Sequence, residues 1–286
     1  MPARLIDGSA HARAIREEIR LAVSRLPAGR RPPSITVIQV GDDPASTVYV
    51  RNKHRAAEAT GFRSAILQLP ASTSQVDLLE RIRALGRDPD VDGILVQMPL
   101  PDGLDANEAL EAIPPSKDVD GLHPYNAGRL AQGNPTFVPA TPLGVLELLR
   151  RERIDPTGRH AVVVGRSRLV GRPLALLLLQ NHATVTICHS QTVDLPAITR
   201  TADILVAATG RPGLITGDHV KPGAVVMDVG ITRDPVTNRL VGDLERPTVD
   251  PVASAVTPVP GGVGPMTVAM LLVNTLRAYR QRPGQA

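Results

Sequence analysis

Helix-like and strand-like segments alternate along the chain, and this alternation restricts its fold more than any other feature of the sequence. Residues 9–26 carry one apolar stripe, formed by Ile15, Ile19 and Val23, as expected of an amphipathic helix. Residues 34–40 (SITVIQV) are a β-branched run typical of a buried strand. The alternation continues with helical patterns at 45–60, 75–85 and 105–112 and with strand patterns at 64–69 and 93–97. Such an order predicts a mostly parallel sheet covered by helices.

A second series of the same kind starts at residue 160. It follows residues 114–142, which are rich in proline and glycine, show little periodicity and are interpreted as an inter-domain linker or a functional loop. Strand patterns then lie at 161–165, 184–188, 204–208 and 224–229, and helical patterns at 173–181, 195–201 and 266–280. We therefore predict two α/β domains with the active site in the cleft between them. Residues 1–140 and the C-terminal helix 264–286 form the first, catalytic domain, and residues 141–263 form a Rossmann-like nucleotide-binding domain.

The composition excludes two classes of partner. Of 32 basic residues only Lys53, Lys117 and Lys221 are lysines, and the aromatic residues are two Phe and three Tyr without Trp. Single-stranded nucleic acids are bound by stacked aromatic side chains in a basic groove, for which this supply is poor. Acidic and basic residues are interspersed, with a net charge of +4, so we expect no nucleic-acid partner. A lysine-rich helix that binds a membrane surface is also excluded.

The sequence predicts a cytoplasmic protein without a membrane partner. The first residues show no signal-peptide pattern, and the longest leucine cluster, residues 174–179, is far too short to span a bilayer. The single cysteine, Cys188, excludes an intrachain disulfide. Its place in the apolar run TVTIC predicts a buried and inert thiol.

A glycine turn joins the strand pattern AVVV to the helical pattern that follows. Gly165 and Gly171 take the first and last glycine positions of a G-x-G-x-x-G-like turn lengthened by one residue, and Ser167 takes the middle position. Such a turn directs backbone N–H groups and a helix N-terminus toward a pyrophosphate. We interpret it as a nucleotide site, and a merely structural turn is the alternative.

The end of the next strand pattern bears on which dinucleotide binds. NAD sites usually carry an acidic residue about 20 residues beyond the turn, where it holds the ribose 2′-hydroxyl. Residues 188–190 contain no acid, and Asp194 comes later, where it can cap the next helix. Arg166 and Ser190 are placed to contact a 2′-phosphate, so we expect NADP rather than NAD.

A tyrosine and a lysine lie close together in the helical pattern of residues 45–60. Tyr49 and Lys53 are four residues apart, so they share a helix face with Cβ atoms about 6 Å apart. An ammonium shielded from water can have a lowered pKa and act as an acid or a base. Taken alone, the pair fits a surface lysine packed over a ring better than a catalytic site.

Two further polar residues are candidate ligand contacts. Gln97 ends the strand pattern GILVQ, and ligands bind beyond the carboxyl ends of strands in open α/β sheets. Asp120, in KDVDGLHP, can accept hydrogen bonds from donor nitrogens of a heterocycle. A polar strand end and an Asp-Gly turn are the alternatives. No group of His, Cys, Asp or Glu has metal-ligand spacing, so no metal site is expected.

Sequence blocks with specific motifs span nearly the whole chain. They are VGDDPASTVYVRNKHRAAEATGF, VDGILVQMPLP, KDVDGLHPYNAGRL, VVVGRSRLVGRP, ATVTICHS and TPVPGGVGPMT. In this order the blocks resemble the bifunctional methylenetetrahydrofolate dehydrogenase/cyclohydrolase family. The combination of PGGVGPMT with KDVDG and YVRNK is specific.

The resemblance implies two linked reactions on a reduced folate, as part of one-carbon metabolism and purine biosynthesis. The first oxidises 5,10-methylenetetrahydrofolate with NADP⁺ to the methenyl cation, and the second hydrolyses that cation to 10-formyltetrahydrofolate. The resemblance also implies a homodimer.

The resemblance further implies roles for individual residues. Lys53 serves the hydrolysis, Tyr49 stacks against the folate, and Gln97 interacts with the lysine. Asp120 holds the pterin. The remaining implied contacts are Gly165, Arg166, Ser167 and Ser190 to the cofactor, Ile231 beside the nicotinamide, and Pro260 and Gly261 in a loop that closes on substrate and cofactor.

The chain departs from the family pattern at a few positions, and two other functions stay open. Gln191 follows Ser190 where a basic residue is common, which leaves fewer contacts for a 2′-phosphate. Ala140 stands where many members have Cys. A monofunctional dehydrogenase is one alternative, although the retained Lys53 argues against it. A non-catalytic folate- or nucleotide-binding module is the other.

Overall fold

The structure is a computed structural model that describes residues 2–282, and it divides into two compact units. The six-stranded unit comprises residues 1–12 and 141–267, and the three-stranded unit comprises residues 13–140 and 268–286. Both units pack helices on parallel sheets, so the predicted α/β class is confirmed. The division differs from the predicted domains at residues 264–267, which fall in the six-stranded unit, and at residues 1–12, because β1 (Arg4–Leu5) pairs with β11 (Ala255–Val256) of the six-stranded sheet.

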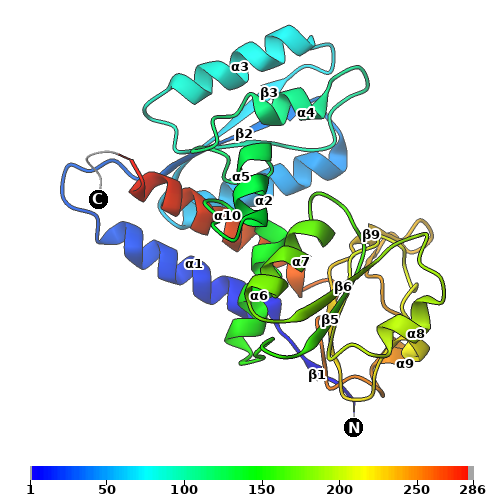
Figure 1. Ribbon diagram of the computed structural model, residues 1–286. Coiled ribbons are helices and arrows are strands. Elements are labelled where there is room, and N and C mark those ends of the chain that lie inside the picture. Colours follow the sequence, from blue (N-terminus) through cyan, green and yellow to red (C-terminus); the bar gives the residue numbers. More distant parts are fainter. Residues whose placement is uncertain (1, 283–286) are drawn as a thin grey trace. The chain divides into compact units, whose positions relative to one another are not determined.

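The three-stranded unit places helices on both faces of a parallel sheet with the order β3-β2-β4 (Figure 1). The strands are β2 (Ser34–Val40), β3 (Arg63–Leu69) and β4 (Gly93–Val96), and the helices are α1 (Gly8–Ser24, whose first residues belong to the other unit), α2 (Pro44–Ala59), α3 (Gln75–Arg87) and α4 (Ala106–Glu111). Ile38 of β2 packs with Leu78 and Ile82 of α3 on one face. On the other face, Gln39 donates a hydrogen bond to the Thr47 hydroxyl of α2 at 2.8 Å.

Residues 114–142 are not a plain linker or loop, because they contain helix α5 (Pro124–Ala131). The ring nitrogen of His123 accepts a hydrogen bond from the N–H of Tyr125, and Pro124 supplies the helix-compatible backbone of the first turn. Asn274 of α10 (Val263–Arg280) donates hydrogen bonds to carbonyls on either side of α5, at Val119 (2.8 Å) and Val138 (3.0 Å). The segment therefore packs into the three-stranded unit.

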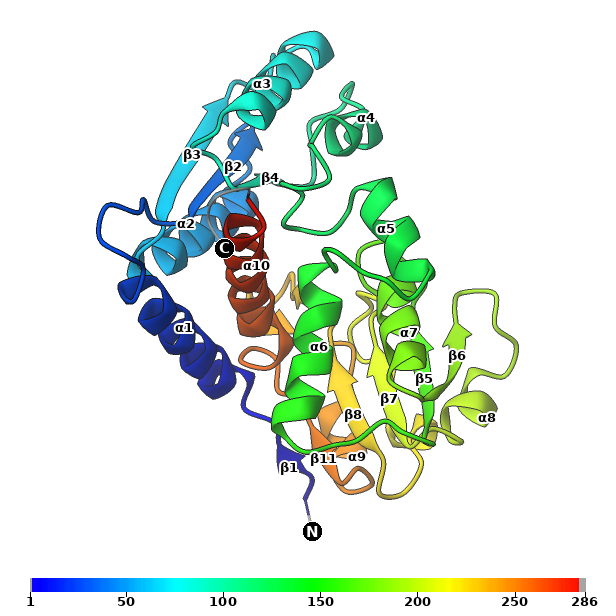
Figure 2. The same ribbon diagram turned by 60° about the vertical axis from the view of Figure 1, so that its left-hand side comes forward.

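The six-stranded unit has a parallel sheet with the order β1-β11-β8-β7-β5-β6. Its other strands are β5 (His160–Val164), β6 (Thr184–Cys188), β7 (Ile204–Ala207) and β8 (Val225–Asp228). Figure 2 shows α6 (Ala140–Arg151) and α7 (Gly171–Gln180) on one face. A buried cluster covers the other face with α8 (Leu195–Thr199), the 3-10 helix Gly217–His219 and α9 (Arg246–Val249). A small antiparallel pair, β9 (Thr232–Arg233) and β10 (Leu240–Val241), lies apart from this sheet.

Both sheets contain a point at which the strand order reverses. In the six-stranded sheet β5 lies between β6 and β7, and in the three-stranded sheet β2 lies between β3 and β4. At such a point the connections on either side of the central strand run in opposite directions. This opens a crevice at the carboxyl ends of the strands. Each unit therefore offers one position for a ligand.

Candidate active site

Lys53 and Gln97 meet at the carboxyl end of the three-stranded sheet. Asp43 caps the start of α2 by accepting a hydrogen bond from the N–H of Ser46 (2.7 Å), and α2 carries Lys53 on its third turn. The Lys53 Nζ atom donates a hydrogen bond to Oε1 of Gln97 at 2.9 Å. The Nε2 atom of Gln97 donates to the Met98 carbonyl at 2.7 Å, which turns the amide oxygen toward the lysine.

The charges of Asp120 and Lys53 each shift the pKa of the other. Burial lowers the pKa of Lys53 below its ordinary value, and the charge of Asp120 opposes that shift. Burial raises the pKa of the Asp120 carboxyl, Lys53 lowers it, and the charge of Asp118 raises it further. Desolvation thus disfavours the charged form of both groups, so proton transfer at the lysine becomes possible nearer neutral pH.

The loop that carries Asp120 is fixed by a buried carboxylate beside it. Asp118 is 1% exposed and accepts hydrogen bonds from the backbone N–H groups of Leu122 (3.1 Å) and His123 (2.9 Å). The Asn126 side chain of α5 donates a third bond to it at 2.8 Å. Gly121 has a φ of +70°, and a Cβ there would lie 2.5 Å from the backbone of Pro139. The Asp-Gly turn and the functional aspartate are therefore compatible interpretations.

Tyr49, on the same helix as Lys53, is exposed and can contact a ligand. It lies one turn before Lys53 on α2, and 42% of it is exposed to solvent. A large aromatic ring that is not packed into the core can stack on a flat ligand. His54, the neighbour of Lys53, instead contacts the Ser64 hydroxyl at 2.9 Å, as a structural residue would.

The six-stranded unit contains a cavity of about 380 Å³ at the crevice between β5 and β7. Its lining includes the predicted residues Gly165, Arg166, Ser167 and Ser190. Gly165 has a φ of +129°, and a Cβ there would lie 2.2 Å from the Ala208 carbonyl oxygen. Only glycine fits at this point, so the turn after β5 can pass close to the loop after β7.

The turn itself closes tightly on the start of α7. A Cβ on Gly171 would lie 2.0 Å from the Gly165 carbonyl oxygen, so the last glycine of the motif permits this close approach. Ser167 accepts a hydrogen bond from the N–H of Val170 at 3.1 Å. This arrangement matches the close backbone approach that a pyrophosphate site needs.

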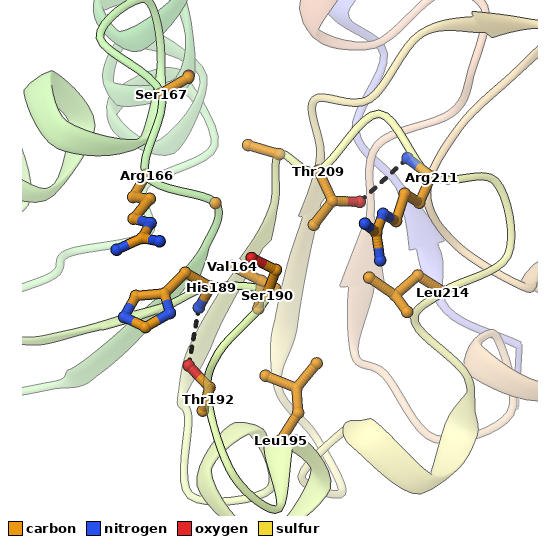
Figure 3. Close-up of a pocket in the computed structure, with 12 residues that line it drawn as sticks. Val164, Arg166, Ser167, His189, Ser190, Thr192, Leu195, Thr209, Arg211 and Leu214 are labelled. Atoms are coloured by element: carbon orange, nitrogen blue, oxygen red, sulfur yellow. Dashed lines mark hydrogen bonds between the residues drawn. The ribbon is translucent and has the colours of Figure 1, made fainter.

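Side chains of the three loops that follow β5, β6 and β7 flank the cavity (Figure 3). Figure 3 shows Arg166 and His189 on one side, Arg211 and Leu214 on the other, and Ser190 between them. Sequence reasoning did not predict the lining residues His189, Thr192, Leu195, Ala208, Thr209, Arg211 and Leu214. The run ILVAATG could have indicated the lining residues of this loop, since its last residues follow the carboxyl end of β7 and ligands bind beyond such strand ends.

Four predicted residues lie in the six-stranded unit but outside the lining of this cavity: Gly171 of the turn, already described, and three residues further along the chain. Ile231 follows β8, is 39% exposed, and approaches the position of a Cβ on Gly264 to 3.1 Å. Pro260 is exposed, and Gly261 has a φ of +106°. The carbonyl of Gly261 accepts a hydrogen bond from the N–H of Ser9 at 2.8 Å. The loop before α10 is thus joined to the start of α1.

Several other predictions concern single residues or absences. Cys188 is buried, and burial raises the pKa of its thiol, so the prediction of a buried thiol is confirmed. Asp194 caps α8 as expected. Within residues 2–282, we find no cluster of three His, Cys, Asp or Glu side chains that could hold a metal. No helix in the described part of the chain is both long and apolar enough to cross a bilayer.

Comparison with known proteins decides the family. The model of the tetrahydrofolate dehydrogenase/cyclohydrolase catalytic domain matches residues 6–120, and the model of its NAD(P)-binding domain matches residues 139–283. The chain belongs to the tetrahydrofolate dehydrogenase/cyclohydrolase family. The resemblance expected from the sequence blocks is therefore confirmed.

Relatives in the tetrahydrofolate dehydrogenase/cyclohydrolase family match over nearly the whole chain. The bifunctional protein FolD of Magnetococcus marinus is 54% identical over 98% of both chains. The bifunctional enzyme FolD of Campylobacter jejuni has a solved structure with a TM-score of 0.94 and 45% identity, covering 96% of this chain and 98% of that chain. The Trypanosoma brucei enzyme, solved with NADP cofactor and an inhibitor, has a TM-score of 0.93 and 42% identity over 98% of both chains.

Proposed function

We propose that this chain catalyses both reactions of its family. It oxidises 5,10-methylenetetrahydrofolate to 5,10-methenyltetrahydrofolate with NADP⁺, and it hydrolyses the product to 10-formyltetrahydrofolate. The observation that supports the second reaction most strongly is the 2.9 Å hydrogen bond between the part-buried Lys53 and Gln97 beside Asp120. A surface lysine packed over a ring does not explain these contacts.

For hydrolysis, Lys53 serves as the proton carrier. Its neutral amine accepts a proton from the water that adds to the methenyl carbon. Because the formyl group of the product stays on N10, the bond from that carbon to N5 must break. The Lys53 ammonium then returns the proton to N5, and the amine is restored. As the formyl C=O bond forms, the hydroxyl proton of the adduct passes to solvent, so the reaction releases one proton overall. Gln97 orients the lysine, Asp120 binds the pterin, and Tyr49 stacks against the folate.

For oxidation, the six-stranded unit binds the dinucleotide. The tight glycine turn and the cavity of about 380 Å³ fit a pyrophosphate-bearing ligand. Gly165, Ser167 and Gly171 form the turn, and Arg166 and Ser190 bind the 2′-phosphate. NADP⁺, when bound, supplies the hydride acceptor. Ile231 lines the nicotinamide side, and Pro260 and Gly261 lie in a loop that closes on both ligands. The placement of this active site between the two units stays a prediction.

Two assays on the purified chain test this function. NADPH formation from 5,10-methylenetetrahydrofolate measures the oxidation, and loss of methenyltetrahydrofolate absorbance measures the hydrolysis. We expect both activities. Oxidation without hydrolysis would indicate a monofunctional dehydrogenase, and absence of both with retained ligand binding would indicate a binding module.

A cofactor comparison tests the 2′-phosphate contact. Arg166→Ala should raise the KM for NADP⁺ about 10- to 100-fold, because a charge-assisted hydrogen bond contributes about 1.5–3 kcal/mol. The KM for NAD⁺ should stay the same, since NAD⁺ lacks that phosphate. Arg172→Ala, on an exposed arginine of α7, is the matched control. Equal rates with both cofactors in the unmodified chain would refute the preference.

A homodimer, a cytoplasmic location and a role in purine biosynthesis complete the proposal. Family membership supports them, together with the absence of a membrane-spanning helix in residues 2–282. Light scattering of the purified chain tests the dimer, for which the expected mass is twice 30.4 kDa.

A further inference from the structure

Two buried carboxylates join the loops at the carboxyl end of the six-stranded sheet. Asp228 is the last residue of β8 and is 3% exposed, and Asp243 follows β10 and is fully buried. The burial of two neighbouring acidic groups is unfavourable unless hydrogen bonds satisfy them. The hydrogen-bond partners of the two carboxylates therefore show which segments they hold in place.

Backbone N–H groups from several loops are those partners. The Oδ2 atom of Asp243 accepts hydrogen bonds from the N–H groups of Thr209 (2.6 Å) and Gly210 (3.2 Å). The N–H of Asp243 donates to Oδ1 of Asp228 at 2.9 Å. The N–H of Asp228 in turn donates to the Thr257 hydroxyl at 2.7 Å. A chain of bonds thus runs from the loop after β7 to the segment before α10.

Glycines make room for both carboxylates. A Cβ on Gly230 would lie 2.0 Å from Oδ1 of Asp243, and a Cβ on Gly242 would lie 1.9 Å from Oδ2 of Asp228. Among the described residues, Oδ1 of Asp243 has no hydrogen-bond partner. Burial raises the pKa of Asp228 to about 6, and the neighbouring charge of Asp243 also raises it. The burial of the two carboxylates therefore lowers the stability of the fold. They are not needed to hold β7 and β8 together, because these strands already pair through their own backbones.

The loop held by Asp243 forms one wall of the nucleotide cavity. Thr209 and Arg211 line that cavity opposite Arg166 (Figure 3). Ala208, at the start of the loop, is the residue that a Cβ on Gly165 would strike. A shift of this loop would therefore move the cavity wall and the close contact with the phosphate turn together.

We propose that Asp243 is a positioning residue for the dinucleotide. It anchors the N–H groups of Thr209 and Gly210, and it acts on the cofactor through the loop 208–211 without lining the cavity. Bonds from N–H groups to a carboxylate are stronger than bonds to a neutral acceptor, which suits a loop that must hold one shape. This inference rests on the proposed use of the cavity for NADP.

The test is a graded series of substitutions read out by direct titration of NADP⁺. Asp243→Ala removes both acceptor bonds, and we expect at least a tenfold rise in the Kd. Asp243→Asn keeps an acceptor oxygen but loses the charge, so it should lie between Ala and the unmodified chain. Asp203→Ala is the matched control, because Asp203 accepts the N–H of His160 (2.9 Å) at the opposite, amino end of the sheet. Its Kd should not change.

Hydrolysis of methenyltetrahydrofolate without added cofactor serves as the second readout. The residues proposed for its proton transfer lie in the three-stranded unit, so hydrolysis should stay unchanged in the Asn variant while NADP⁺ affinity falls. If Asp243→Ala does not fold, the Asn variant decides. An unchanged Kd in the Asn variant, or a parallel loss of hydrolysis and affinity, would overturn the inference. If the unmodified chain does not bind NADP⁺, the proposed function fails instead.

Discussion

The Lys53 amine can exchange protons nearer neutral pH because burial lowers its pKa. The surrounding side chains refine that property. Gln97 accepts one of its hydrogen bonds, and Asp120 favours the charged form. At the residue scale, the site is a lysine whose desolvation and counter-charge act in opposite directions, so its titration should respond to each neighbour separately.

Asp120→Asn should shift the pH dependence of hydrolysis toward lower pH. Asp120 raises the pKa of Lys53, so removal of its charge should lower that pKa further. The neutral amine is the form that accepts a proton, and the limb on which the hydrolysis rate rises with pH should therefore move to lower pH. The measurement is the hydrolysis rate at saturating substrate across pH. A shift to higher pH would show that Asp120 does not act on the lysine in this way.

At the scale of elements, the glycines differ in whether their position requires glycine or would also accept a residue with a Cβ. Gly165 has a φ of +129° and no space for a Cβ, because the Ala208 carbonyl oxygen is 2.2 Å away. Gly128 is exposed in the middle of α5, and a Cβ there would meet nothing within 4 Å. The two residues should respond in opposite ways to substitution by alanine.

Gly128→Ala should stabilise the chain by about 0.5–1 kcal/mol, since alanine loses less conformational freedom than glycine in a helix. Gly165→Ala should destabilise the six-stranded unit and abolish NADP⁺ binding. Thermal unfolding followed by circular dichroism measures both effects, and NADP⁺ titration checks the second. A Gly165→Ala variant that binds NADP⁺ normally would contradict the tight turn.

The helices and strands differ in how far the sequence predicts them. The strand at 34–40 was predicted with its observed bounds, because a short run rich in β-branched side chains favours a buried strand over a helix. Helix α5 was not predicted, because Pro124 and Gly128 hide its short pattern and its stability comes from packing by Asn126 and Leu130. Strands β1 and β11 have two residues each and exist only through pairing between distant segments.

The candidate site divides in the same way. Gln97, Gly165 and Arg166 were identifiable because they stand at a strand end or in a glycine turn, whereas Lys53 received its role only through the resemblance to the family. Asp243 and Thr209 were not identifiable, because their importance depends on a hydrogen bond between residues 34 positions apart in the sequence. Periodicity reports the environment of neighbours in the chain, and it carries no information about such pairings.

At the scale of the whole molecule, the two proposed activities share the folate-binding residues and differ in the other groups they use. The residues proposed for proton transfer in hydrolysis lie in the three-stranded unit, and the cavity proposed for NADP lies in the six-stranded unit. A substitution of the proton-transfer lysine or of a residue of the cofactor cavity should therefore affect one reaction more than the other. This separation is the central claim, and the lysine offers the most selective test of it.

The deciding measurement compares both reactions in one preparation of Lys53→Met. Hydrolysis of methenyltetrahydrofolate should fall about 10²- to 10⁴-fold, the range expected when a general acid–base group is lost. NADPH formation should stay within the same order of magnitude, because methionine is an unbranched side chain of similar length and Lys53 does not line the cavity proposed for NADP. Lys221→Met, which breaks only a surface ion pair with Asp203, is the control and should change neither rate. Hydrolysis at the unmodified rate in Lys53→Met would contradict the account.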